Sequence, residues 1–320
     1  MMNFILLPLL ISIPTVTTDV VHPVEAVAVL NSVITEAPDP SATSMALVTG
    51  GPLTILETAA STGRFDTLAA ALTAANLVST LEGPGPFTVF APTDAAFAAF
   101  PQQRLNYLLQ PRNVDVLTSA LTFHVVSGAV DANTVLGSPF VTTLNGQRAE
   151  ISSSLVQIEG SNFLATDIIC SNGIIHIIDK VMLPEFRNVT GLTASTPGFG
   201  TLNAALIATG LDLTLNSPGD FTVFAPTDAA FQALPAGVLD SLLANPAALT
   251  DVLLYHVTPG RLYASDVIAV ATLPMLNMAD TTISVGPMGA MINNSLITVT
   301  DIEVANGVVH VIDVVLVPGP

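Results

Sequence analysis

An eleven-residue stretch, FTVFAPTDAAF, occurs twice in this chain without a change, at residues 87–97 and 221–231. Other blocks repeat around it in the same order, each 132 or 134 positions from its match. The matching blocks are FDTLAAAL (65–72) with FGTLNAAL (199–206), FHVVSG (123–128) with YHVTPG (255–260), and ATDIICSNGIIHIIDKVMLP (165–184) with VTDIEVANGVVHVIDVVLVP (299–318). A period this long indicates tandem domains, because solenoid repeats are typically about 20–50 residues long.

The 320 residues therefore predict two domains of one kind, at 52–187 and 188–320. Half of the residues are apolar, enough to fill two cores. The early part of each unit is rich in Ala and Leu at helical spacing, and the last third reads as strands broken by Asn-Gly turns at 172–173 and 306–307. Helices followed by antiparallel strands predict an α+β fold, here a wedge or sandwich of strands wrapped by several helices.

The N-terminal residues read as a targeting segment. Residues 4–13 form an apolar run too short to span a bilayer, and Ala26-Val27-Ala28 offers small residues for cleavage. We expect a signal peptide at 1–28, a linker at 29–51, no transmembrane segment, and a secreted or cell-surface protein.

The charge balance excludes some partners. Lys and Arg number 7 against 25 Asp and Glu, for a formal net charge of -18. A polyanion needs clustered basic side chains, so we expect no nucleic acid partner and no attraction to an anionic membrane.

The duplicated stretch could mark chemistry or architecture. Thr93 stands where a helix N-cap is needed, and Asp94 in the first turn suits the positive end of the helix dipole. A catalytic Thr-Asp pair would need a base nearby, and the local sequence has none. The stretch therefore predicts a strand, a proline stop and a capped helix.

Four of the five histidines are repeat-equivalent: His124 with His256, and His176 with His310. On a strand, His176 and Asp179 point to opposite faces, which argues against a dyad. We expect these histidines to lie in the core or just behind it. Two per domain are too few for zinc without distant carboxylates. The lone Cys170 matches Val304 of the second copy, which favours a buried apolar position.

Other signals of chemistry are missing from the sequence. It has no calcium-loop spacing, no complete dinucleotide or P-loop motif and no Gly-x-Ser-x-Gly elbow. We therefore predict no enzymatic activity, no catalytic residues, no cofactor and no metal.

Two features suit a surface protein. Asn188 and Asn293 begin N-glycosylation tripeptides, NVT and NNS. The stretch 273–295 carries four methionines in a segment broken by Gly and Pro. It could pack inside its own domain or offer an adaptable apolar contact surface, and the sequence leaves both open.

The duplicated stretch, the Tyr255-His256 pair and the closing NGVVHVID together resemble the fasciclin (FAS1) domain family, as two complete copies over 52–320. The resemblance implies a compact wedge of antiparallel strands wrapped by helices. It also implies an adhesion module that is secreted or anchored at the cell surface, commonly glycosylated and not an enzyme.

In some animal members of that family, adhesion to integrins is attributed to an Asp-Ile pair before the last strand and to the Tyr-His region. By position, the resemblance implies these adhesion candidates: Asp167, Ile168, Phe123 and His124 in the first copy, and Asp301, Ile302, Tyr255 and His256 in the second. Phe123 departs from the family's usual Tyr, so its hydroxyl contact is lost. Neither pair has the flanking residues of the animal motif, and the chain has no Arg-Gly-Asp.

The leading hypothesis is a non-enzymatic adhesion or matrix protein that binds a protein, a polysaccharide or a second copy of itself. The alternative is a scaffold or ligand-binding subunit that docks onto a larger complex through the methionine-rich segment of the second domain. A hydrolase would need a His, an acid and a nucleophile converging in one cleft.

Overall fold

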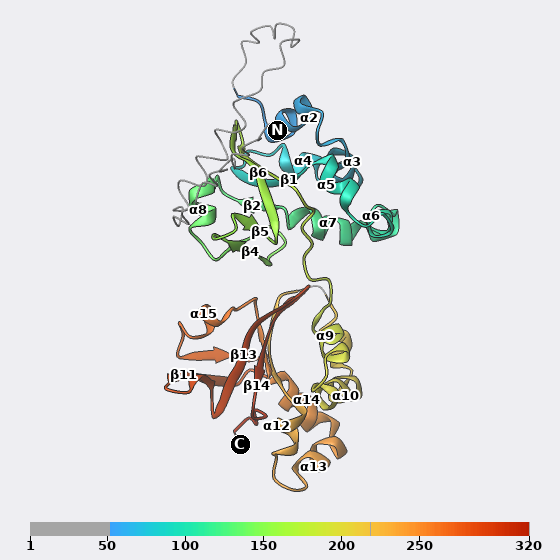
Figure 1. The fold of residues 1–320 in the computed structure, drawn as a ribbon. Helices are drawn as coiled ribbons and strands as arrows, with labels where there is room; N and C mark the ends of the chain where they lie inside the picture. Colours follow the sequence, from blue (N-terminus) through green and yellow to red (C-terminus); the bar gives the residue numbers. More distant parts are fainter. Residues whose placement is uncertain (1–51, 218, 320) are drawn as a thin grey trace, which may run out of the picture.

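The structure is a computed structural model that describes residues 52–217 and 219–319. The expected signal peptide and linker lie outside the described residues. The described chain forms two domains that follow one another from end to end, one from α2 to β7 and one from α9 to β14 (Figure 1). An extended connection joins them.

The first domain begins with helices and ends with strands. Its elements are α2 (Ile55–Thr62), α3 (Asp66–Ala74), α4 (Val78–Leu81), β1 (Phe87–Pro92), α5 (Asp94–Ala99), α6 (Gln102–Leu108), a 3-10 turn η1 (Pro111–Asn113), α7 (Val114–Thr122), β2 (Val125–Ser127), α8 (Ala132–Leu136), β3 (Phe140–Thr142), β4 (Arg148–Ser152), β5 (Gln157–Ile158), β6 (Ser161–Cys170) and β7 (Gly173–Ile178).

The second domain repeats this order. Its elements are α9 (Val189–Ser195), α10 (Gly200–Thr209), α11 (Leu211–Thr214), β8 (Phe221–Pro226), α12 (Asp228–Gln232), α13 (Val238–Ala244), α14 (Pro246–Leu254), β9 (Val257–Pro259), α15 (Ala264–Val267), β10 (Thr272–Pro274), β11 (Asp280–Gly286), β12 (Gly289–Ile292), β13 (Ser295–Val304) and β14 (Gly307–Ile312).

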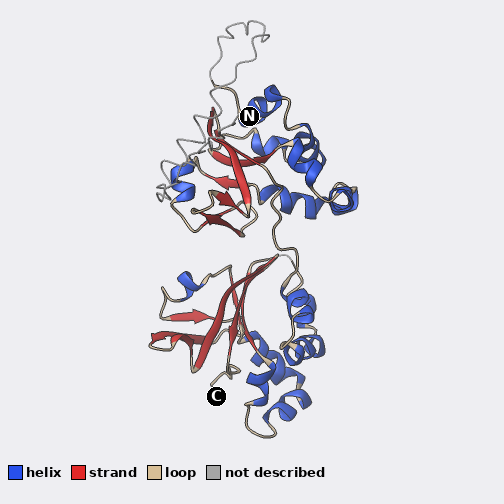
Figure 2. Ribbon diagram, viewed as in Figure 1, coloured by secondary structure: helices blue, strands red, loops and turns tan. Residues whose placement is uncertain are grey.

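Each domain is built on a seven-stranded sheet, in the orders β2-β1-β7-β6-β5-β4-β3 and β10-β11-β12-β13-β14-β8-β9. All neighbours are antiparallel except one pair per sheet, in which β1 runs parallel to β7 and β8 runs parallel to β14. Figure 2 shows the larger helices gathered on one side of each domain and the strands on the other. The α+β prediction is confirmed, and the parallel pair departs from the antiparallel strands that the sequence predicted.

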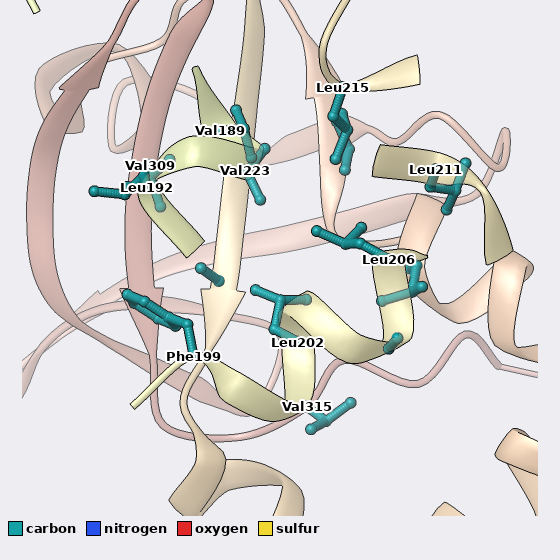
Figure 3. Close-up of a cluster of buried hydrophobic side chains, with 14 of the residues drawn as sticks. Val189, Leu192, Phe199, Leu202, Leu206, Leu211, Leu215, Val223, Val309 and Val315 are labelled. Atoms are coloured by element: carbon teal, nitrogen blue, oxygen red, sulfur yellow. The ribbon is translucent and has the colours of Figure 1, made fainter. Parts of the chain in front are cut away.

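Two apolar clusters flank each sheet. In the second domain, the cluster on the helix side joins α9, α10 and α11 to β8 and β14, and it includes Leu202 and Leu206 of α10 with Val223 and Val309 of the strands (Figure 3). The opposite cluster centres on Phe224, Ile292 and Ile312, each of which is fully buried. Strands that are covered on both faces carry apolar residues at consecutive positions, as the duplicated stretch does.

The duplicated corner is structural in both copies. The hydroxyl of Thr93 accepts the backbone N–H of Ala96 at 3.2 Å and so caps α5, as predicted. The carboxylate of Asp94 reaches further than its own helix, because it accepts the N–H groups of Asp66 (3.2 Å) and Thr67 (2.8 Å) at the start of α3. Those bonds hold the pKa of the Asp94 carboxyl below its usual range. One Asp therefore joins two helix starts.

The Asn-Gly turns also hold distant segments together. The buried side chain of Asn172 accepts the N–H of Ile55 at 2.9 Å and donates to the carbonyl of Leu81 at 2.7 Å. Gly173 has a φ of +153°, and a Cβ there would lie 1.9 Å from the carbonyl oxygen of Phe87. Only glycine allows β7 to approach β1 this closely.

Candidate adhesion sites

Asp301 lies at a bulge of β13, where its φ is +59°. Its backbone N–H donates to Nδ1 of His310 at 3.2 Å, and its Oδ1 accepts the N–H of Ala264 at 2.7 Å. The carboxylate therefore caps the start of α15, and the backbone is held by a histidine. Asp is one of the few residues that tolerate a left-handed conformation.

Asp167 repeats this arrangement in β6. Its φ is +57°, its N–H donates to His176 at 3.2 Å, and its Oδ1 accepts the N–H of Ala132 at 2.8 Å. Ile168 and Ile302, which follow the two aspartates, are half-buried and pack on the helix-side clusters. The structure thus engages both Asp-Ile pairs in the fold of their own domains.

His176 and His310 are fully buried, which confirms the predicted core position. Nε2 of His176 donates to the carbonyl of Val130 at 2.9 Å, since a carbonyl can only accept, and Nδ1 is left as the acceptor for Asp167. The ring stacks on Phe90 with centroids 5.5 Å apart. Burial lowers the pKa of both histidines, so each is a neutral brace behind the bulge.

His124 and His256 each link the end of a helix to the segment that follows the last strand of the domain. Nδ1 of His124 donates to the carbonyl of Ala120 at 2.8 Å, and Nε2 accepts the N–H of Met182 at 3.0 Å. His256 makes the same two bonds in its own domain. Burial lowers the pKa of each to about 4, so both rings are neutral at pH 7.

The residues before these histidines differ in their polar contacts. Tyr255 is 5% exposed, and its hydroxyl donates to the carbonyl of Asp280 at 3.0 Å and accepts Nδ2–H of Asn293 at 3.0 Å. Phe123 is 2% exposed and packs with Phe90 in the cluster of the first domain that corresponds to the Phe224 cluster of the second. Asp301 is exposed, whereas Tyr255 and His256 are buried, so these three residues do not form one exposed face.

Both glycosylation candidates are half-buried and bonded. Asn188 is the N-cap of α9, where Oδ1 accepts the N–H of Gly191 at 2.7 Å, and Nδ2 contacts Asn216. Asn293 has a φ of +51°, and its Oδ1 accepts the N–H of Thr282 at 2.8 Å. In the folded domain, both amides are therefore already used.

The methionine-rich segment 273–295 divides between core and surface. Met275 is 3% exposed, Met291 is half-buried, and Met278 and Met288 are 96% and 81% exposed. The two exposed methionines lie beyond opposite ends of β11, whose ends are about 20 Å apart at about 3.3 Å per residue. They do not make a single methionine surface.

The remaining candidates for chemistry are structural where the structure describes them. Cys170 is 7% exposed, as predicted for a core position, and burial raises the pKa of its thiol. Within residues 52–217 and 219–319, no group of three or more His, Cys, Asp or Glu side chains is placed to hold a metal ion. In the same ranges, no helix is both long enough and apolar enough to cross a membrane.

Sequence reasoning did not identify the residues that join the two domains. The guanidinium of Arg148, on β4, lies between the rings of Phe140 and Tyr263, 3.7 and 3.3 Å from their centroids. Glu303 of β13 accepts the backbone N–H of Arg148 at 2.8 Å and the hydroxyl of Tyr263 at 2.5 Å. We call these four residues the Arg148 clamp. The four residues are not conserved between the two copies, so comparison of the copies gave no sign of the clamp.

The profile of the Fasciclin domain matches this sequence twice, at residues 63–184 and 197–318. The chain belongs to the fasciclin family. The prediction of two tandem domains of this family is thereby confirmed.

The alignments with two individual fasciclin relatives cover about three quarters of this chain. The transforming growth factor-beta-induced protein ig-h3 of Sus scrofa is 33% identical over 245 residues, which are 74% of this chain and 35% of that protein. Human periostin is 26% identical over 252 residues, which are 77% of this chain and 30% of that protein. This chain thus spans about a third of their length.

A shorter fasciclin relative, protein sll1483 of Synechocystis, is 41% identical over 151 residues, which are 47% of this chain and 83% of that protein. Among solved structures, a FAS1 domain pair from the insect cell adhesion molecule Fasciclin I aligns over 80% of this chain and 97% of its own, with 18% identity and a TM-score of 0.37.

Proposed function

We propose that this protein is a secreted or cell-surface, non-enzymatic adhesion or matrix protein that binds a protein or polysaccharide through its two fasciclin domains. The observation that supports it most is the pair of complete Fasciclin domains at 63–184 and 197–318. In this proposal, the domains extend over 52–187 and 188–320, behind a signal peptide at 1–28.

The surface of the described residues is compatible with contact rather than chemistry. The histidines of both copies are neutral braces inside the domains, and each Asp of the Asp-Ile pairs caps a helix of its own domain. Several large apolar side chains remain exposed, among them Ile169 at 66% and Leu213 at 72%. A partner that covers such side chains would gain apolar burial.

The experiment is attachment of cells and of matrix glycans to surfaces coated with the purified full-length chain. Binding that saturates with coating density and is competed by soluble chain supports the proposal. Absence of binding to either class of surface would contradict it. Sequencing the N-terminus of the natural, exported protein tests the signal peptide separately.

One variant tests the family's Asp-Ile site. Asp301→Asn keeps an oxygen that can cap α15 and keeps tolerance of the left-handed conformation, but it removes the charge. If the carboxylate contacts the partner, binding falls while the unfolding temperature hardly moves. Asp240→Asn, at an exposed position in α13, is the matched control and leaves binding unchanged.

The exposure of Met278 and Met288 favours docking to a larger complex as a second candidate. Because the two side chains lie at opposite ends of β11, they would act as separate contacts. Met278→Ser and Met288→Ser, made singly, distinguish them: loss of capture of a partner with one variant and not the other identifies the contact. If capture is unchanged in both variants, this candidate is wrong.

A further inference from the structure

The Arg148 clamp, made of Arg148, Phe140, Tyr263 and Glu303, joins the two domains through different faces. The face of the first domain is not the repeat-equivalent of the face of the second. Arg148 and Phe140 come from β4 and β3, whereas Tyr263 precedes α15 and Glu303 lies in β13. Among the described residues, Nε of Arg148 is buried and has no hydrogen-bond acceptor. The side chain is therefore held by the two aromatic faces, which attract a cation.

The surroundings of the clamp are rich in carboxylates. Beside it lies a cavity of about 660 Å³ lined by residues of both domains. Its lining contains Arg148 as the one basic side chain, and its acidic side chains are Glu150, Glu159, Glu185, Asp301 and Glu303. Burial raises the pKa of the Glu159 carboxyl, and the nearby carboxylates of Glu150 and Glu303 add to this. Arg148 therefore offsets carboxylates that both domains bring to this cavity, where Glu185 is already paired with Arg187 at 2.7 Å.

The repeat shows what stands at the two outer ends of the pair, which we call the free ends because no other described residue covers the equivalent faces there. The backbone bond from Leu144 to Val125 recurs from Leu276 to Val257, which sets the equivalence at 132 positions in this region. The next block is offset by 134, as the bonds from Asp167 to His176 and from Asp301 to His310 show. The clamp residues Phe140, Arg148, Tyr263 and Glu303 thus correspond to Thr272, Asp280, Asp131 and Ile169.

These counterparts cannot form a second clamp. At the free end of the second domain, Asp280 replaces the arginine and Thr272 replaces its aromatic platform, and both are exposed. At the free end of the first domain, Asp131 stands in place of the tyrosine, and Ile169 stands in place of the glutamate. If a second copy of the chain docked end to end in the same geometry, Asp280 would meet Asp131, and like charges would repel.

We propose that the Arg148 clamp is a recognition contact that forms once, between the two domains of one chain. It fixes their relative arrangement, and the mismatched counterparts prevent the chain from extending end to end through the same faces. This inference does not depend on which partner the protein adheres to. Self-association, where it occurs, must use another surface.

The first test uses the full-length chain in small-angle X-ray scattering. Arg148→Ala should raise the radius of gyration and broaden the distance distribution. The matched control is Asp280→Ala, which alters the repeat-equivalent exposed position and should leave both quantities as in the wild type. An unchanged radius of gyration in Arg148→Ala, with circular dichroism showing folded domains, would overturn the proposal.

The second test installs the missing clamp. The substitutions Thr272→Phe and Asp280→Arg at one end, with Asp131→Tyr and Ile169→Glu at the other, give the free ends the residues that the domains use between themselves. Sedimentation velocity should then show concentration-dependent end-to-end association that the wild type lacks. A folded quadruple variant whose mass distribution equals that of the wild type would show that the clamp does not specify the contact. If the wild type associates and Asp280→Ala abolishes that association, the claim that these ends prevent end-to-end extension is wrong.

Discussion

Replacing Asp167 by alanine removes two contributions to the stability of the first domain. The carboxylate accepts the N–H of Ala132, the first residue of α8, at 2.8 Å beside the N-cap Asp131, and loss of such a bond costs about 1 kcal/mol. The backbone at this residue has a φ of +57°, and a left-handed conformation costs an ordinary residue such as alanine about 1–2 kcal/mol. The variant should therefore lower the free energy of unfolding by about 2–3 kcal/mol.

Asp167→Asn separates the two roles of this side chain. Asparagine keeps an acceptor for the Ala132 N–H and tolerates the left-handed backbone, so its cost should stay below about 1 kcal/mol. Differential scanning calorimetry of the full-length chain measures both variants. At about 4 °C per kcal/mol, Asp167→Ala should lower the transition of the first domain by about 10 °C.

The second domain serves as an internal reference in the same scan, because Asp301 and its bonds are untouched. Two results would refute the reasoning. One is a shift of less than about 2 °C for Asp167→Ala, which would mean that the observed bond and backbone contribute little. The other is an equal shift for alanine and asparagine, which would mean that the charge, and not the cap or the backbone, is what matters.

Three further outcomes follow from the same structure. Lowering the pH from 7 to 5 should destabilise each domain by about 2 kcal/mol, because the native pKa of His124 and His256 is about 4 and the unfolded value is about 6.5. The unfolded chain then binds the proton first, so this stability is complete above pH 6.5 and is lost as the pH falls towards 4; equal urea midpoints at the two pH values would contradict it. Tyr255→Phe should cost about 1–2 kcal/mol in urea unfolding, because the bonds to Asp280 and Asn293 are lost inside the domain. Gly307→Ala should prevent folding of the second domain, as judged by circular dichroism, since a Cβ would lie 1.9 Å from the carbonyl oxygen of Phe221, whereas Gly286→Ala, which has open space and no left-handed backbone, should fold.

Local signals in the sequence predicted the elements that depend on neighbouring residues. The Thr93 cap and the proline stop follow from the preferences of a few adjacent positions, and the structure has them as expected. The buried position of His176 was predicted by strand alternation, because His176 shares a face with isoleucines. The repeat added the domain count, since one unit could be checked against the other.

Contacts between distant residues were out of reach. Asn172 looked like a turn residue, yet its side chain bonds to Ile55, 117 positions away. Arg148 and Glu303 are 155 positions apart, and no pattern in either copy links them. The parallel pairing of β1 with β7 likewise joins segments that have the whole domain between them. Such contacts arise only when the chain has folded, so propensity and periodicity carry no trace of them.

The two copies differ most informatively where they face outward. Asp167 and Asp301 are identical because each copy needs the same bulge and the same helix cap, so their identity says nothing of a partner. Ile169 and Glu303 occupy equivalent places beside those aspartates, and one is 66% exposed while the other joins the domains. A residue that both copies need for folding cannot distinguish one partner from another. Specificity in this protein should therefore come from positions where the copies differ, and the Asp-Ile pairs should act chiefly by holding those positions in place.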